Sequence, residues 1–260
     1  MIRLRDMLRE LQIGDKLFAD PGEAVVEAEP GAEWPEFISR LYRGDFEPNT
    51  REETEILTRL IGYITDLPDR DPRLIGLLQQ LLPLRSRFPA ILDPQGAEPI
   101  AGSERAAWAT DANRRVWRGA VLSPKRALEF THGSRVRRIA VSGAQSMWHS
   151  YLRDPTSTAY AYVITSPTVT YRSAGGPMIS FTANPRVAHE FAARHSGRGD
   201  VPVIFGISRR DPDLIMNPDA MNALTGVYQE HETLLLRNQF RPEVVIFITP
   251  YSPKYIRSLV

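Results

Sequence analysis

Cysteine is absent from this 260-residue chain, and so are long apolar runs. Without cysteine the chain cannot form disulfides, use a thiolate nucleophile, or bind zinc or iron–sulfur clusters through thiolates. No apolar run approaches the ~20 residues that span a bilayer. The N-terminal stretch Met1–Asp6 alternates charged and apolar residues and lacks the apolar core of a signal peptide. With 42% apolar and 24% charged residues, the composition predicts a globular protein with no membrane partner and no signal peptide.

Lysine and histidine are scarce. Only Lys16, Lys125 and Lys254 occur among the 32 basic residues, so arginine carries almost all of the positive charge. The five histidines show no HExxH or comparable spacing, so we expect no metal site.

The net charge of +1 conceals a split between the two parts of the chain. Residues 1–100 carry 12 basic and 19 acidic side chains, a net charge of −7, whereas residues 101–260 carry 20 basic and 12 acidic, a net charge of +8. The basic part favours a phosphate-bearing ligand or partner, although the two parts could equally attract each other.

The first part of the chain has the pattern of a small helical unit. Apolar residues recur at helical spacing within 1–12, 33–43, 50–64 and 71–85. Proline and glycine then become frequent within 86–104. We therefore predict a helical N-terminal region at 1–90, a linker at 91–104 and a second domain at 105–260. The helices complete a core or bind a partner.

Beyond the linker, short apolar runs alternate with helical signals. Ser123-Pro124 and Asn184-Pro185 are typical helix starts, and the second helix is predicted to face inward with Val187, Ala188 and Phe191. Together the segments predict an α+β domain. Strands are predicted near 116–122, 136–141, 160–165, 178–182, 201–207, 232–236 and 244–248, with 167–172 as a further candidate.

Polar residues interrupt three of these predicted strands. Arg118 lies within Val-Trp-Arg-Gly-Ala-Val, where a charge must face a ligand or pair with an acid, and Gly119 beside it would let a ligand approach the backbone. Ser180 lies at a strand end before a helix. Glu230 and Glu232 precede Thr-Leu-Leu-Leu, and in an extended strand they would share one face. Such a pair suits a site that stabilises positive charge or moves a proton.

In this order the residues resemble the mono-ADP-ribosyltransferases of the Arg–Ser–Glu class, the cholera-toxin-like, arginine-specific enzymes. That family has an Arg-Gly in its first strand, a Ser-X-Ser/Thr strand end followed by a helix, and a Glu-X-Glu before a leucine-rich strand. The matching segments here are Arg118-Gly119, Ser180-Phe181-Thr182 and Glu230-His231-Glu232. The resemblance covers about residues 104–260 and implies the split β-sheet core of that family, with an N-terminal helical subdomain.

The resemblance implies NAD as co-substrate and a role for each matched residue. Glu232 would stabilise the oxocarbenium-like state and grip the ribose, Ser180 would orient Glu232, and Arg118 would hold the NAD phosphates. Glu230 would face the incoming nucleophile, and a carboxylate there suits a protein arginine. The remaining NAD-binding candidates are Gly119, Phe181 and Thr182, with the ring of Phe181 or Phe191 offered for stacking on nicotinamide, although core packing is the simpler role for Phe191.

The acceptor and the setting stay open at this stage. The basic part of the chain makes RNA or DNA an alternative acceptor, and a non-enzymatic binding module or a lone NAD glycohydrolase are further alternatives. The resemblance implies a bacterial toxin or effector, either cytoplasmic or delivered into a target cell by a specialised secretion system.

Overall fold

The computed structural model describes a mixed α+β protein built around one large antiparallel sheet. The described residues are 72–86, 88–96, 114–132, 135–141, 159–173, 178–195, 199–218, 232–248 and 250–260. The helices expected within 1–12, 33–43 and 50–64 lie outside these ranges, so the predicted helical region is represented only from Pro72 onward.

The sheet has eight strands in the order β2-β3-β10-β6-β1-β5-β8-β7, and β4 and β9 form a separate pair. Every pairing is antiparallel. Most predicted strands are confirmed within a residue or two. The candidate at 167–172 contains the short strand β4, whereas β7 and β9 were not anticipated. The strands are β1 (Arg115–Leu122), β2 (Arg135–Val141), β3 (Ala159–Thr165), β4 (Tyr171–Arg172), β5 (Ile179–Thr182), β6 (Val201–Ser208), β7 (Leu214–Ile215), β8 (Glu232–Leu235), β9 (Gln239–Phe240) and β10 (Val244–Ile248).

The helices follow simple start signals. In α6, α7 and α9 the side chain of the residue before the helix accepts a backbone hydrogen bond, and proline occupies the first position. No helix in the described ranges is long and apolar enough to cross a membrane. The helical segments are α4 (Pro72–Leu81), η2 (Leu82–Leu84), α5 (Pro89–Leu92), η3 (Pro94–Gly96), α6 (Pro124–Glu129), α7 (Pro185–Arg194) and α9 (Pro253–Ser258).

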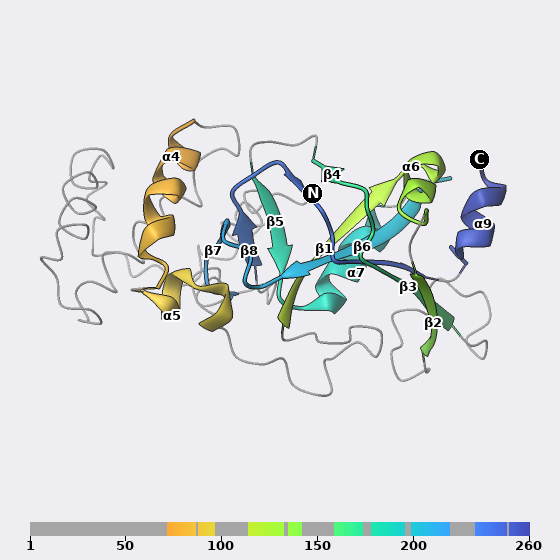
Figure 1. The fold of residues 1–260 in the computed structure, drawn as a ribbon, viewed down its shortest axis with the longest axis horizontal. Coiled ribbons are helices and arrows are strands. Elements are labelled where there is room, and N and C mark those ends of the chain that lie inside the picture. The colour runs from red at the N-terminus through yellow and green to blue at the C-terminus, as the bar shows by residue number, and fades with distance from the viewer. Residues whose placement is uncertain are drawn as a thin grey trace, which may run out of the picture.

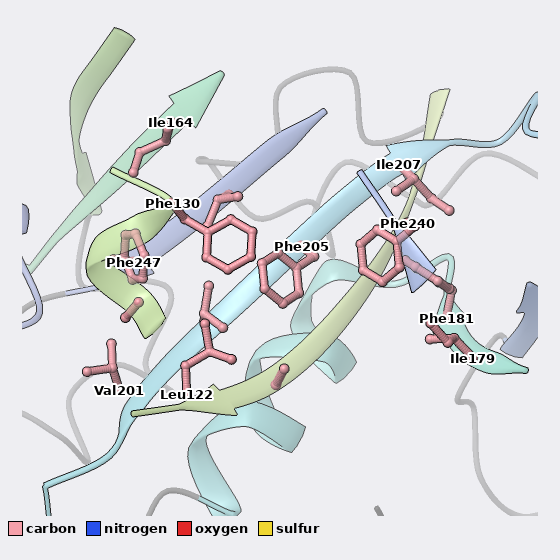
Figure 2. Packing of buried hydrophobic residues seen from close by; sticks show 14 of the residues in the cluster. Leu122, Phe130, Ile164, Ile179, Phe181, Val201, Phe205, Ile207, Phe240 and Phe247 are labelled. Carbon is pink, nitrogen blue, oxygen red and sulfur yellow. The ribbon is translucent and has the colours of Figure 1, made fainter. Parts of the chain in front are cut away.

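The two faces of the sheet have different cores. One face carries an aromatic cluster in which Phe205 packs against Phe130 and Phe240 at ring-centroid distances of 5.2 and 5.7 Å. Figure 2 shows these rings in succession along β6, with Phe181 beyond them. On the other face α7 packs against β1, and Trp117 and Ala188 belong to a second, smaller cluster. Each face of β1 is therefore buried, which accounts for its nearly continuous apolar sequence.

The two edge strands of the sheet, β7 and β2, have different neighbours, as Figure 1 shows. At the β7 end, the backbone N–H groups of Met216 and Asn217 donate to the carbonyls of Leu92 and Ile91, at 2.9 and 2.8 Å. At the same end Arg85 donates to the carbonyl of Leu214 at 2.8 Å. At the opposite end, β3 is the one strand of the described ranges that pairs with β2. Part of the stretch predicted as a linker thus forms helical turns that are hydrogen-bonded to the sheet domain.

Candidate functional site

Three neighbouring strands of the sheet carry the polar residues that stand out in the sequence: β1 holds Arg118, β5 holds Ser180 and β8 holds Glu232. β1 is paired with β6 along its whole length, but with β5 at one position only, Trp117 opposite Thr182. The part of β5 that precedes Thr182 is therefore free of the β1 ladder. A side chain of β1 can reach the β5 backbone there, and Arg118 does so.

Arg118 is buried, with 8% of its surface exposed. Its Nη1 donates to the Ser180 carbonyl at 2.8 Å, whereas its Nε has no hydrogen-bond partner. No carboxylate of the described residues forms an ion pair with it. A guanidinium stays charged at all physiological pH values, and a buried charge without a counter-charge costs several kcal/mol. The site therefore has an electrostatic demand that an anionic ligand would meet.

Ser180 and Glu232 lie diagonally across the β5–β8 ladder. Thr182 is opposite Glu232 and Ser180 is opposite Leu234, so Ser180 and Glu232 share a face two positions apart. The Ser180 hydroxyl donates to the Oε1 of Glu232. Both residues are only partly buried, so ligand contact does not require them to move.

Ser180 is the centre of this arrangement. Its carbonyl accepts from Arg118 and its hydroxyl donates to Glu232, so one residue joins a buried cation to a carboxylate. Hydrogen bonds on both sides fix the orientation of the Glu232 carboxylate relative to the guanidinium. This geometry suits a ligand that carries negative charge at one end and develops positive charge at the other.

Gly119 has a different role from the expected one. A Cβ at this position would lie 1.9 Å from the Ala188 carbonyl oxygen and 2.8 Å from the Ala192 backbone nitrogen. The glycine therefore admits the α7 backbone rather than a ligand. Its contribution to the site is indirect, since it lets α7 pack closely against β1.

Phe181 is also placed away from the site. Its side chain is 2% exposed and its ring meets that of Phe240 edge-on at 5.0 Å, within the aromatic cluster. Strand alternation directs it to the face opposite Ser180. Stacking of Phe181 on a nicotinamide is thus contradicted by its burial. Phe191 is half-buried on α7, where its ring stacks on that of His195 at 4.3 Å.

Thr182 shapes the turn between β5 and α7. Its Oγ1 accepts from the Asn184 backbone N–H at 3.0 Å, and Asn184 in turn caps the helix by accepting from Arg186. With 7% of its surface exposed, Thr182 supports the strand end on which Ser180 lies.

Glu230 lies outside the described residues, and β8 begins at Glu232. The predicted shared face of the two glutamates therefore stays a prediction. Among the described residues no group of three or more His, Asp or Glu side chains is arranged to hold a metal ion.

The supporting contacts at the β7 end were not anticipated from the sequence. Thr233, directly after Glu232, is fully buried and its hydroxyl donates to the Ile215 carbonyl at 2.8 Å. Ile215 is followed by Met216, which has a positive φ of 81° and donates its backbone N–H to Leu92. Segment 72–96 therefore braces the strand that starts with Glu232. The sequence shows leucines at helical spacing in this segment, but that spacing does not indicate which strand the leucines pack against.

His189 lies on the buried side of α7. It is 5% exposed on α7, and burial lowers the pKa of its imidazole to about 4.

No protein-family model matches this chain, and neither a curated protein nor a solved structure does.

Proposed function

We propose that this protein transfers ADP-ribose from NAD to an arginine side chain of a protein and releases nicotinamide. The observation that carries the proposal is the double hydrogen bonding of Ser180, which joins the buried, uncompensated Arg118 to Glu232. The order Arg–Ser–Glu and the early separation of β1 from β5 both resemble the split-sheet core of the ADP-ribosyltransferases.

Each residue has a role that its surroundings support. The Arg118 guanidinium would bind the NAD pyrophosphate, which supplies the counter-charge that the described structure lacks. Glu232, oriented by Ser180, would stabilise the positive charge that develops on the ribose as the bond to nicotinamide breaks. The electron pair of that bond leaves with nicotinamide.

The acceptor completes the reaction. A guanidine nitrogen of the protein substrate would attack the ribose carbon, and Glu230 would pair with the guanidinium and take the proton that is lost. Residues 1–71, which lie outside the described ranges, are candidates for binding a partner. As part of the same proposal, the protein acts as a bacterial toxin or effector.

The test is labelling of a cell lysate with NAD that carries a labelled adenylate group. Wild-type protein is expected to label polypeptides, and mass spectrometry should locate the label on arginine. The isosteric variant Glu232→Gln should lose about 100- to 1,000-fold in rate, because the charge that stabilises the transition state is gone while the shape is kept. Glu129→Gln, on the surface of α6, is the matched control and should label normally.

Other outcomes would redirect the proposal. Label that resists protease but disappears with nuclease identifies a nucleic-acid acceptor, which the +8 charge of residues 101–260 would favour. Free nicotinamide without a labelled acceptor identifies a glycohydrolase. NAD binding without turnover, or no binding, identifies a non-enzymatic module.

A further inference from the structure

The outer edge of β2 is the least covered part of the sheet. β2 pairs with β3 along all seven of its residues, and in the described part of the chain no strand pairs with its other side. An edge strand directs the backbone N–H and C=O groups of alternate residues outward, so this side can hydrogen-bond to another extended chain. The opposite end of the sheet differs, because α5 and η3 contact the segment that follows β7.

Arginine side chains occupy both faces of this edge. Arg135 and Arg137 lie opposite Thr165 and Val163 on the β3 ladder, and Arg138 lies on the other face, opposite Tyr162. All three are exposed, and among the described residues none forms an ion pair.

The neighbours of these arginines add contacts that a polypeptide would use. The Arg138 guanidinium lies over the Tyr160 ring at 4.3 Å, which holds it close to the strand. Val136, between the arginines, is 42% exposed and presents an apolar side chain. A phosphate chain would use the charges alone, whereas an extended peptide would also use the backbone edge and the apolar contact.

We propose that the β2 edge binds an extended acidic peptide segment of a partner protein by strand addition. The peptide backbone pairs with the open edge of β2. Acidic side chains on one face of the peptide meet Arg135 and Arg137, and an acidic side chain on its other face meets Arg138. This surface is separate from the Arg118–Ser180–Glu232 site. Strands β3, β10 and β6 lie between β2 and β1, which is the nearest strand of that site. It does not depend on the proposed reaction.

The test measures the binding, to the full chain, of a fluorescent peptide of about eight residues in which pairs of Glu alternate with pairs of Val, so that both faces of the extended peptide carry acidic side chains. The triple variant Arg135→Gln, Arg137→Gln, Arg138→Gln should bind about tenfold or more weakly, because charge-assisted contacts are lost. The matched control, Arg172→Gln, Arg194→Gln, Arg257→Gln, removes three exposed arginines elsewhere and should change binding less than about twofold. Equal thermal melting of the variants shows that the fold is kept.

A second arm separates strand addition from simple charge attraction. The same peptide N-methylated at alternate residues keeps its charge but loses backbone donors, and it should bind about tenfold more weakly. The proposal is overturned if the wild-type chain does not bind the peptide or if the control variant loses as much affinity as the β2 variant. It is also overturned if inorganic polyphosphate displaces the peptide while N-methylation has no effect, since the arginines would then act only as charges on a protected edge.

Discussion

Two arginines in neighbouring parts of the sheet are held in opposite ways. Arg237, in the connection between β8 and β9, donates to Asp211 at 2.5 Å, to Asp213, and to the Gln239 carbonyl at 3.1 Å. Arg118 is buried, whereas Arg237 is only partly buried, yet within the described ranges Arg118 has one hydrogen bond and no carboxylate partner. A fold that needed only stability would give the deeper charge the better partners. Arg237 therefore holds neighbouring segments together, whereas the anionic ligand proposed above would supply the counter-charge of Arg118.

His189 is a buried base that differs from both arginines because it becomes neutral. It is as deeply buried as Arg118, but burial lowers the pKa of the imidazole to about 4, so the ring is neutral at physiological pH. Arginine cannot become neutral in this way, because its guanidinium does not lose its proton in proteins. Arg237 is compensated by its carboxylates: burial alone would lower its pKa, but the charge and hydrogen bonds of Asp211, together with those of Asp213, raise it. Arg118 is buried and charged, and no carboxylate of the described residues forms an ion pair with it.

The largest expected effect concerns His189, which acquires a charge in the core when the pH is lowered and so tests how the fold tolerates a buried cation. The folded-state pKa of about 4 lies below the ordinary 6.5, so the unfolded chain binds more protons between these values. The free energy of unfolding should therefore fall as pH drops from about 6.5 to about 4, by at most about 3 kcal/mol. Denaturant unfolding over that range measures it. His189→Gln should flatten the dependence and the exposed control His132→Gln should keep it; identical slopes in all three proteins would contradict the assignment.

The next effect concerns Arg118 and tests the ligand side of the comparison. Arg118→Met keeps the length of the side chain but removes the charge, and NAD should bind about 10- to 100-fold more weakly because the phosphate contact is lost. The unfolding free energy of the ligand-free protein should stay the same or rise by about 1 kcal/mol or more, because the variant removes the cost of burying an unpaired charge. Calorimetric titration and denaturant unfolding measure the two quantities.

Arg115→Met is the matched control for Arg118. It lies on the same strand and pairs at 3.1 Å with Glu243, which is largely exposed, so its loss should leave NAD affinity unchanged. Unaltered NAD affinity in Arg118→Met would remove this residue from the proposed site.

The sequence predicted the long strands better than it predicted the packing between elements. Strands β1, β6 and β10 are buried on both faces and read as continuous apolar runs. For α7 the sequence predicted an inner face of Val187, Ala188 and Phe191, of which the structure buries Ala188 and leaves the two larger side chains half-exposed. The cause is Gly119, which lets the helix approach so closely that only small side chains fit between helix and strand. Such a pairing of distant small residues has no local signal.

The β7 end shows the same limit. β7 has two residues, too few for a period, and its place in the sheet is set by Thr233 and by the backbone of Ile91 and Leu92. Among the site residues, Ser180 and Glu232 could be paired from strand alternation once their strands were known to be neighbours. The lack of a carboxylate beside Arg118 in the described residues could not be predicted from the sequence, because it depends on which side chains surround the guanidinium in the folded structure.

The smallest expected effect concerns Arg237 and decides whether the comparison holds. Arg237→Met removes the partner of Asp211, whose side chain is 15% exposed, and of Asp213, which is more exposed. The unfolding free energy should fall by about 1–2 kcal/mol, with NAD affinity unchanged, and a double-mutant cycle with Asp211→Asn should show coupling between the two residues. Arg118→Met is expected to give the reverse, lost affinity with no lost stability. If both variants cost the same stability and leave NAD binding alone, then Arg118 is a structural cation like Arg237, and the buried charge no longer argues for an anionic ligand.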